Sequence, residues 1–257
     1  MSGTAGTVHA AGVLYAGRVI GHRGACARAP ENTLASIRRA ALDGAAMVEV
    51  DVKLTAEGRP VLFHDDRLDR TTDGHGPVAS ATLDMLGALD AGAWFGPEFA
   101  GEPIPTLEEA VETILGLGLG VNLEIKPCRG REAETARVVA QVAADMWPTD
   151  RAPPVLSSFS RESLAVARDM APALPRALIA DTLPGDWKEA ALILGLKAVH
   201  LGPKVTAADV AAVTAGGHAV AVWTINNVTR AASLLAQGVQ AVFTDDPRVL
   251  IHAMDQR

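Results

Sequence analysis

Two pairs of charged residues, each with its members two positions apart, stand beside short apolar runs of this sequence. Glu49 and Asp51 form one pair, and Glu124 and Lys126 form the other. Side chains two apart on a strand point to the same face, and buried carboxylates need pairing or a metal. Three carboxylates that converge on one point are typical of a hard-cation site, which favours Mg²⁺ or Ca²⁺ over Zn²⁺. We therefore expect Glu49, Asp51 and Glu124 to bind one divalent cation.

A network of structural ion pairs, such as Glu49 with Lys126, is the alternative interpretation of the same residues. A single Glu-x-Asp pair would favour that alternative. Two such pairs, with histidines at neighbouring run ends, favour the metal site instead.

Two histidines, His22 and His64, also end apolar runs, and Arg23 directly follows the first of them. Imidazole titrates near neutral pH, so the two rings could supply a general acid and a general base. Arg23 and Lys126, together with a metal, could neutralise phosphoryl oxygens. This combination indicates cleavage of a phosphodiester, which needs neutralised oxygens, an activated nucleophile and a protonated leaving group.

Other polar and aromatic residues near the run ends receive different interpretations. Trp223 and Phe159 could pack an apolar ring against a glycerol backbone, although ordinary barrel packing explains their spacing equally well. Asp245 and Asp246 are expected to cap a helix rather than to bind a metal. No role is predicted for His200.

Eight short runs rich in Val, Ile and Leu position these residues, and each is followed by a helix-start signal, an amphipathic segment and a glycine. Thr106 with Glu109, and Asp186 with Glu189, have the spacing of a capping box at a helix start. Eight strand–helix units in one chain predict a TIM (β/α)8 barrel, whose active site forms at the carboxyl ends of the strands. The runs are residues 18–22, 47–52, 121–125, 155–158, 177–180, 198–201, 219–223 and 241–244.

Two segments depart from this rhythm. Residues 60–64 read as a ninth strand, but too few residues separate them from the second run for a helical crossover. We therefore expect an antiparallel hairpin, which would set His64 opposite Glu49. Residues 65–105 are rich in Gly and Asp and show no strand–helix alternation, so we interpret them as a small insertion at the barrel mouth.

The length and composition suit one such barrel. The chain has 257 residues, of which 49% are hydrophobic and 21% are charged, so it can bury a large core. Residues 18–257, with the insertion at 65–105, are therefore expected to form a single catalytic domain. Residues 1–17 read as a loose N-terminal tail.

The net charge and the cysteine content indicate which classes of partner the protein binds and in which cellular compartment it works. The net charge is −7 and no Lys/Arg-rich run occurs, which disfavours nucleic-acid binding. No apolar stretch reaches the ~18 residues of a spanning helix, so no membrane insertion is expected. Cys26 and Cys128 are too few for a disulfide scaffold and are expected to be free thiols, with a redox-sensitive pair as the alternative. These features favour a cytoplasmic protein whose partner is a small-molecule substrate.

Short motifs occur in order from about Arg18 to Pro247. They are His22-Arg23-Gly24, Pro30-Glu31-Asn32-Thr33, Glu49-Val50-Asp51-Val52, Val61-Leu62-Phe63-His64-Asp65-Asp66, Leu68-Asp69-Arg70-Thr71-Thr72, Leu123-Glu124-Ile125-Lys126-Pro127, Ser157-Ser158-Phe159 and Trp223-Thr224-Ile225-Asn226. Any one motif is weak, but so many in this order are highly specific. Together they make the chain closely resemble the glycerophosphodiester phosphodiesterase family, especially its cytosolic bacterial members.

The resemblance implies a barrel with a small inserted segment at its mouth and one Mg²⁺ or Ca²⁺ ion. It implies hydrolysis of glycerophosphodiesters, such as glycerophosphocholine, to sn-glycerol 3-phosphate and an alcohol. The alternatives are a lysophospholipase D-type phosphodiesterase on the same fold and a non-catalytic module that binds phosphate esters. The site residues that the resemblance implies are Glu49, Asp51 and Glu124 as metal ligands, His22 and His64 as the acid–base pair, Arg23 and Lys126 as phosphate contacts, and Trp223 as the aromatic of the substrate pocket.

Overall fold

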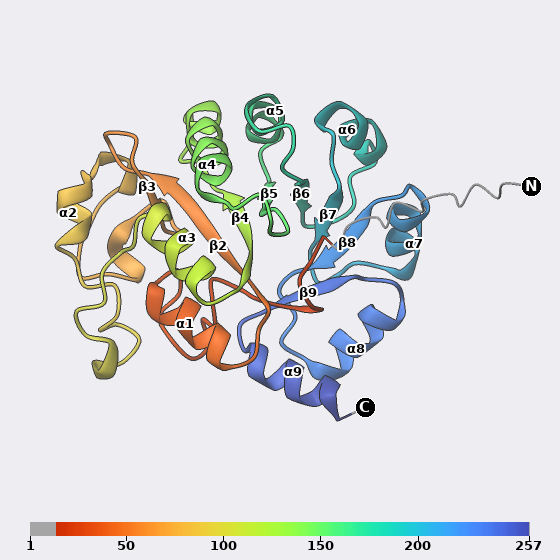
Figure 1. The fold of residues 1–257 in the computed structure, drawn as a ribbon, viewed down its shortest axis with the longest axis horizontal. Coiled ribbons are helices and arrows are strands. Elements are labelled where there is room, and N and C mark those ends of the chain that lie inside the picture. The colour runs from red at the N-terminus through yellow and green to blue at the C-terminus, as the bar shows by residue number, and fades with distance from the viewer. Residues whose placement is uncertain (1–13, 257) are drawn as a thin grey trace, which may run out of the picture.

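A closed barrel of eight parallel strands forms the centre of the computed structural model, which describes residues 14–256 (Figure 1). The sheet order is β1-β9-β8-β7-β6-β5-β4-β2-β3, and pairing of β1 with β2 closes the barrel. The strands are β1 (Val19–Gly21), β2 (Met47–Leu54), β4 (Gly120–Ile125), β5 (Val155–Ser158), β6 (Arg176–Ala180), β7 (Ala198–Leu201), β8 (Ala219–Val222) and β9 (Ala241–Thr244). The eight strands expected from the sequence are therefore confirmed.

Helices surround the strands and alternate with them along the chain, as Figure 1 shows. The capping box of Thr106 with Glu109 is present, whereas Asp186 makes no capping bond. The Asp186 carboxylate instead accepts two hydrogen bonds from the Arg161 guanidinium, at 2.6 and 2.7 Å. The helices are α1 (Leu34–Leu42), α3 (Leu107–Gly116), α4 (Glu132–Met146), α5 (Arg161–Met170), α6 (Trp187–Leu194), α7 (Ala207–Ala215), α8 (Val228–Ala236) and α9 (Pro247–Asp255).

The ninth strand, β3 (Pro60–Leu62), lies outside the barrel and pairs with β2 in the antiparallel sense. Val52 lies opposite Leu62, and this register, continued by the bond from Phe63 N to Asp51 O, sets His64 opposite Val50. The expectation that His64 faces Glu49 is wrong by one residue. The turn is one residue longer than a tight hairpin, because it needs Gly58 at a positive φ of 82°.

Residues 65–105 form four short helical pieces beside β3, at the edge of the molecule in Figure 1. Their apolar side chains make a small core of their own with β3, which includes Phe63, Val78 and Leu86. The pieces are η1 (Leu68–Arg70), η2 (Val78–Ser80), α2 (Leu83–Gly87) and η3 (Pro97–Phe99). We keep the interpretation of this segment as an insertion into a single barrel domain, because its first piece reaches the rim of the barrel through Arg70.

Side chains of the central strand β2 alternate between two environments. Val48, Val50 and Val52 pack outward in one apolar cluster with residues of α1, α3 and α4, while Glu49 and Asp51 point into the barrel. Burying the valines against helices on the outer face is what obliges the carboxylates to face inward.

The amino-terminal end of the described chain closes the barrel floor. Tyr15 is only 4% exposed and packs in the cluster of Ile20, Met47 and Phe243. Of the loose tail expected over residues 1–17, residues 14–16 therefore pack against the barrel, and residues 1–13 lie outside the described residues. Within residues 14–256, no helix is both long and apolar enough to cross a bilayer.

Candidate active site

Three carboxylates meet inside the carboxyl-terminal half of the barrel. Glu49 and Asp51 come from β2, and Glu124 comes from β4, where it lies directly across from Asp51 in the parallel register. One oxygen of each carboxylate lies within 4.8 Å of the others, and all three residues are buried. The structure thus brings together the three acids that the sequence selects as metal ligands.

Two cations partly balance these acids. Lys126 Nζ lies 2.8 Å from Glu124 Oε1 and 3.1 Å from Asp51 Oδ1. Arg23 Nε lies 3.3 Å from Asp51 Oδ2, and the Arg23 backbone N–H donates to Glu49 Oε2 at 2.9 Å. The sequence suggested an ion pair of Glu49 with Lys126 as the alternative to a metal site. Among the described residues, Lys126 pairs with Asp51 and Glu124 instead.

Glu49 is left with a buried oxygen, Oε1, that has no hydrogen-bond partner within residues 14–256. Burial, then repulsion from Asp51 and Glu124, raises the pKa of Glu49 well above its ordinary value. Burial and Asp51 likewise raise the pKa of Glu124 to about 7. Burial also opposes ionisation of Asp51, but Lys126 and Arg23 outweigh it and hold the pKa of Asp51 below its usual range.

These observations fit a divalent cation. An unpartnered buried carboxylate oxygen and two raised pKa values indicate that the cluster lacks positive charge. The donor atoms are all carboxylate oxygens, which hard cations prefer. The acidic cluster of Glu49, Asp51 and Glu124 could therefore hold a metal ion.

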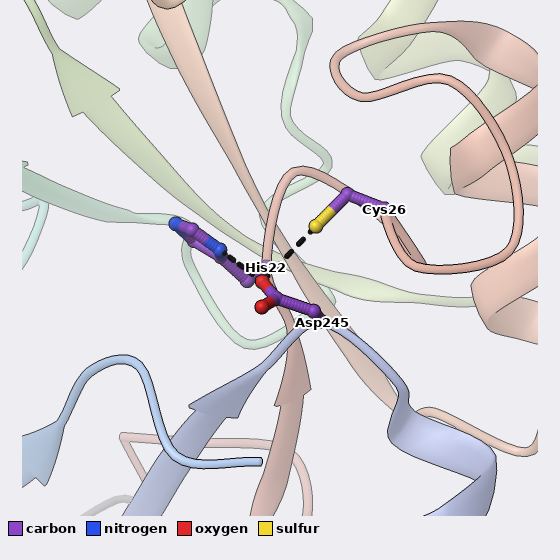
Figure 2. Close-up of side chains that lie close together, drawn as sticks. All are labelled: His22, Cys26 and Asp245. Carbon is purple, nitrogen blue, oxygen red and sulfur yellow. Dashed lines mark hydrogen bonds and ion pairs between the residues drawn. The ribbon is translucent and has the colours of Figure 1, made fainter. Parts of the chain in front are cut away.

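His22 follows β1 and is oriented by an aspartate from the other end of the chain. Its Nδ1 lies 2.7 Å from Asp245 Oδ1, so Nε2 is the nitrogen left free for chemistry (Figure 2). Cys26 Sγ donates to the same oxygen at 3.0 Å, and Asn226 Nδ2 donates to Asp245 Oδ2 at 2.6 Å. Burial opposes the Asp245 charge, but its bonds to His22 and Cys26 keep the pKa of Asp245 below its ordinary value.

The expectation that Asp245 caps a helix is wrong, whereas Asp246 does cap α9 by accepting from Val249 N at 3.3 Å. Asp245 directly follows β9, and the carboxyl ends of the strands carry the site in this fold. That position was the signal in the sequence that could have assigned it to the site.

A second chain of contacts orients His64. His64 Nδ1 lies 2.6 Å from Asp65 Oδ1, and Arg70 Nε donates to Asp65 Oδ2 at 2.6 Å. Arg70 also donates twice to Glu31, at 2.8 Å each, and Glu31 accepts from Arg23 Nη1 at 2.8 Å. Arg70 of the inserted segment thus connects His64 to Arg23 through two carboxylates. Sequence reasoning gave none of these three connecting residues a role, although all lie within the quoted motifs.

The pKa values of His64 and Asp65, the first two groups in this series of contacts, follow from burial and charge. Burial lowers the pKa of His64, and the field of Asp51 offsets only part of that effect. Bonds from Arg70 and His64 hold the pKa of Asp65 below its ordinary value. At neutral pH Asp65 therefore remains an anion that accepts the His64 Nδ1–H.

The local backbone explains why His22 is followed by Arg23 and Gly24. Arg23 has a φ of 51° and Gly24 a φ of 85°, both in the left-handed region that glycine tolerates best. A Cβ at Gly24 would also collide with Ser36 Oγ of α1. This tight turn aims the Arg23 N–H at Glu49 while its side chain reaches Asp51.

A cavity of about 350 Å³ connects these groups. Both histidines and the acidic cluster line it, and two aromatic rings stand at its side: Phe159 is 47% exposed, and its ring centroid lies 5.5 Å from that of Trp223. His200 also lines the cavity. Its Nε2 lies 2.9 Å from the Tyr15 hydroxyl, and burial lowers the pKa of His200 to about 3. All nine residues selected from the sequence lie at or beside this cavity.

Comparisons with known proteins agree with this geometry. Residues 22–249 match the Glycerophosphoryl diester phosphodiesterase family. The chain belongs to this family. A glycerophosphodiester phosphodiesterase of Caldanaerobacter subterraneus subsp. tengcongensis is 36% identical over 242 residues, which cover 91% of this chain and 96% of the relative.

Solved structures of family members share the fold. A phosphodiesterase from Oleispira antarctica, solved in complex with the product sn-glycerol-3-phosphate, aligns with a TM-score of 0.90 at 41% identity, covering 93% of this chain and 96% of its own. A glycerophosphodiester phosphodiesterase from Agrobacterium tumefaciens aligns with a TM-score of 0.77 at 26% identity, covering 92% of this chain and 100% of its own. The TIM barrel expected from the sequence is therefore confirmed.

Proposed function

We propose that this family member hydrolyses glycerophosphodiesters to sn-glycerol 3-phosphate and an alcohol, using one Mg²⁺ or Ca²⁺ ion. The observation that carries the proposal is the meeting of three buried carboxylates with two aspartate-oriented histidines at one cavity. The relative from Oleispira antarctica, solved with sn-glycerol-3-phosphate, supports the product. The cavity volume, about 350 Å³, suits a small-molecule substrate.

Glu49, Asp51 and Glu124 would hold the metal, since their carboxylates converge and one oxygen is unpartnered among the described residues. When bound, a divalent cation supplies Lewis-acid charge that stabilises negative phosphoryl oxygens. Arg23 and Lys126, which both contact Asp51, add cationic groups to the lining of the cavity. Their ion pairs with Asp51 fix both side chains before substrate arrives, which reduces the reorganisation needed during the reaction.

His22 and His64 would act as the acid–base pair through their Nε2 atoms, because an aspartate engages each Nδ1. One imidazole removes a proton from the nucleophile, and the other donates a proton to the leaving alcohol. The nucleophile is either the neighbouring glycerol hydroxyl, which gives a cyclic phosphate that is then opened by water, or water itself. Both routes end in sn-glycerol 3-phosphate and an alcohol.

Phe159 and Trp223 would provide the apolar side of the substrate pocket. Their rings meet edge to face with an interplanar angle of 82°, and Lys126 Nζ lies 6.0 Å from the centroid of the Phe159 ring. The rings thus stand beside a cationic phosphate contact, where they can pack against the carbon atoms of glycerol. This placement supports a substrate role for the two aromatics in addition to packing.

The test is release of glycerol 3-phosphate from glycerophosphocholine by the purified protein with Mg²⁺ or Ca²⁺. His22→Ala and His64→Ala should each lower the rate by ~10²–10⁴-fold, because each removes one acid–base group. His252→Ala, at an exposed histidine of α9, is the matched control and should keep the rate. No release from any glycerophosphodiester with either metal would refute the proposal.

Two further outcomes would replace the proposal with one of the alternatives. A faster rate on lysophosphatidylcholine than on glycerophosphocholine would make the protein a lysophospholipase D-type enzyme. Binding of phosphate esters that is unchanged in both histidine variants, without turnover, would make it a non-catalytic module.

A further inference from the structure

A second group of potential metal ligands lies on the far side of His22 from the reacting nitrogen. His22 Nδ1, Cys26 Sγ and an Asp245 carboxylate oxygen lie within 4.8 Å of one another (Figure 2). Figure 2 shows the imidazole and the thiol flanking the Asp245 carboxylate, and Oδ1 of that carboxylate contacts both, at 2.7 and 3.0 Å. None of the three side chains is fully buried, so ions can reach them from solvent.

The chemistry of this group differs from that of the acidic cluster. Imidazole nitrogen, thiolate sulfur and carboxylate oxygen are the three ligand types that Zn²⁺ binds in proteins. Mg²⁺ and Ca²⁺ prefer all-oxygen sites, such as the one made by Glu49, Asp51 and Glu124. We infer that His22, Cys26 and Asp245 form a second metal site, selective for Zn²⁺ and similar thiophilic ions, which inhibits the enzyme when it is occupied.

Binding requires specific proton movements. Zn²⁺ would replace the thiol proton of Cys26, which leaves to solvent, because a coordinated thiol is deprotonated. It would also bond to His22 Nδ1, so the ring proton must reside on Nε2, the nitrogen that faces the reaction. An imidazole fixed in this form cannot accept a proton at Nε2, and the metal prevents it from cycling between acid and base. The inhibition, but not the binding, rests on the proposed function.

The surroundings explain why the thiol stays available for a metal. Cys26 Sγ donates its proton to Asp245 Oδ1 at 3.0 Å, so the sulfur is held as a thiol in this arrangement. A protonated thiol is a poor nucleophile and oxidises slowly. The free-thiol expectation for Cys26 and the cluster geometry are thus compatible, and the thiol is held beside its two co-ligands by the hydrogen bond to Asp245.

The chain offers a matched control, because Cys128 is its other cysteine. The group near Cys128 Sγ is Lys53 Nζ at 3.9 Å, and the described residues place Cys128 in no cluster of metal ligands. Titration with Co²⁺, as a spectroscopic substitute for Zn²⁺, should produce a near-ultraviolet thiolate-to-cobalt absorption band in the wild-type protein and in Cys128→Ser. The band should be absent in Cys26→Ser. A wild-type protein without the band, or a band lost only in Cys128→Ser, would overturn the proposal.

A second experiment measures inhibition. With glycerophosphocholine and saturating Mg²⁺, the Zn²⁺ concentration for half-inhibition should rise at least ~10-fold in Cys26→Ser relative to wild type, the smallest effect that loss of a supporting group usually has on metal affinity. Each variant is compared with its own rate before Zn²⁺ is added. If Zn²⁺ inhibits Cys26→Ser and the wild type at the same concentration, and more Mg²⁺ relieves the inhibition, then Zn²⁺ binds at the acidic cluster. That result would refute the second site. The cobalt band needs no turnover, so failure of the proposed activity is distinguishable from failure of this site.

Discussion

Replacing Asp245 with Asn tests whether His22 depends on its aspartate. The Asp245 contact to His22 Nδ1, at 2.7 Å, is charge-assisted when the ring is protonated. Loss of a hydrogen bond to a charged group costs about 1.5–3 kcal/mol, which corresponds to a ~10–10²-fold lower rate. The upper bound is the loss in His22→Ala, ~10²–10⁴-fold, because the contact of Asp245 with the acid–base pair is its bond to the His22 ring. We therefore expect Asp245→Asn to lower kcat by at least ~10-fold, but not below His22→Ala.

The assay is steady-state release of glycerol 3-phosphate at saturating Mg²⁺ or Ca²⁺. Asp246→Asn is the matched control, since Asp246 caps α9 and makes no contact with His22; it should keep kcat and cost at most ~1 kcal/mol of stability. The double variant of His22→Ala with Asp245→Asn should be no slower than His22→Ala alone, because residues that act as a unit are not additive. A kcat for Asp245→Asn within twofold of wild type, or a multiplicative loss in the double variant, would refute the reasoning.

Three further predictions follow from the charges of the site. Glu49→Gln should weaken metal binding by more than ~10-fold, because it replaces a carboxylate ligand whose Oε1 has no partner among the described residues, and it should preserve the circular dichroism spectrum, because the two side chains have the same shape. Unchanged affinity by calorimetry would remove Glu49 from the ligand set. Metal binding should release protons and should strengthen as the pH rises through about 7. The metal requires ionised carboxylates, and the pKa of Glu124 is raised to about 7 in the metal-free protein. Equal calorimetric heats in buffers of different ionisation enthalpy would mean that no proton is released and would contradict this prediction. Arg70→Ala should lower kcat about tenfold, because it loses the bonds to Asp65 and Glu31. Arg67→Ala, which removes the surface ion pair with Asp69, should leave kcat unchanged. Equal effects of the two variants would show that Arg70 does not orient the site.

The barrel and its acidic cluster could be predicted because their signals are local. Apolar runs followed by capping residues mark strand–helix units, and Glu49 and Asp51 alternate with valines, so their common face follows from the pleat. Glu124 lies opposite Asp51 once neighbouring parallel strands are aligned at their carboxyl ends.

What the sequence could not predict is which partner each carboxylate contacts. Asp245 reads locally as part of a helix start, yet it binds His22, which lies 223 positions away. Asp186 has the spacing of a capping box, yet the two hydrogen bonds from Arg161 take up its carboxylate. Both errors arise because tertiary contacts override local propensity, and local spacing carries no information about residues brought near by barrel closure.

The one-residue error in the β2–β3 hairpin has a different cause. Register depends on the length and type of the turn, and Gly58 at positive φ lengthens the turn beyond the tight form assumed from the sequence. Its consequence for the site is small, because His64 lies beyond the end of β3 and its orientation is fixed by Asp65 rather than by strand pairing.

The central claim is that Glu49, Asp51 and Glu124 together bind one divalent cation beside the two histidines. A crystal structure of the protein with Mg²⁺ or Ca²⁺ and sn-glycerol 3-phosphate tests it most directly. We expect one ion bonded to an oxygen of each carboxylate at ~2.0–2.6 Å, and phosphate oxygens between the imidazoles of His22 and His64. A phosphate held elsewhere, or an ion that leaves these three carboxylates paired only with Lys126 and Arg23, would contradict the account.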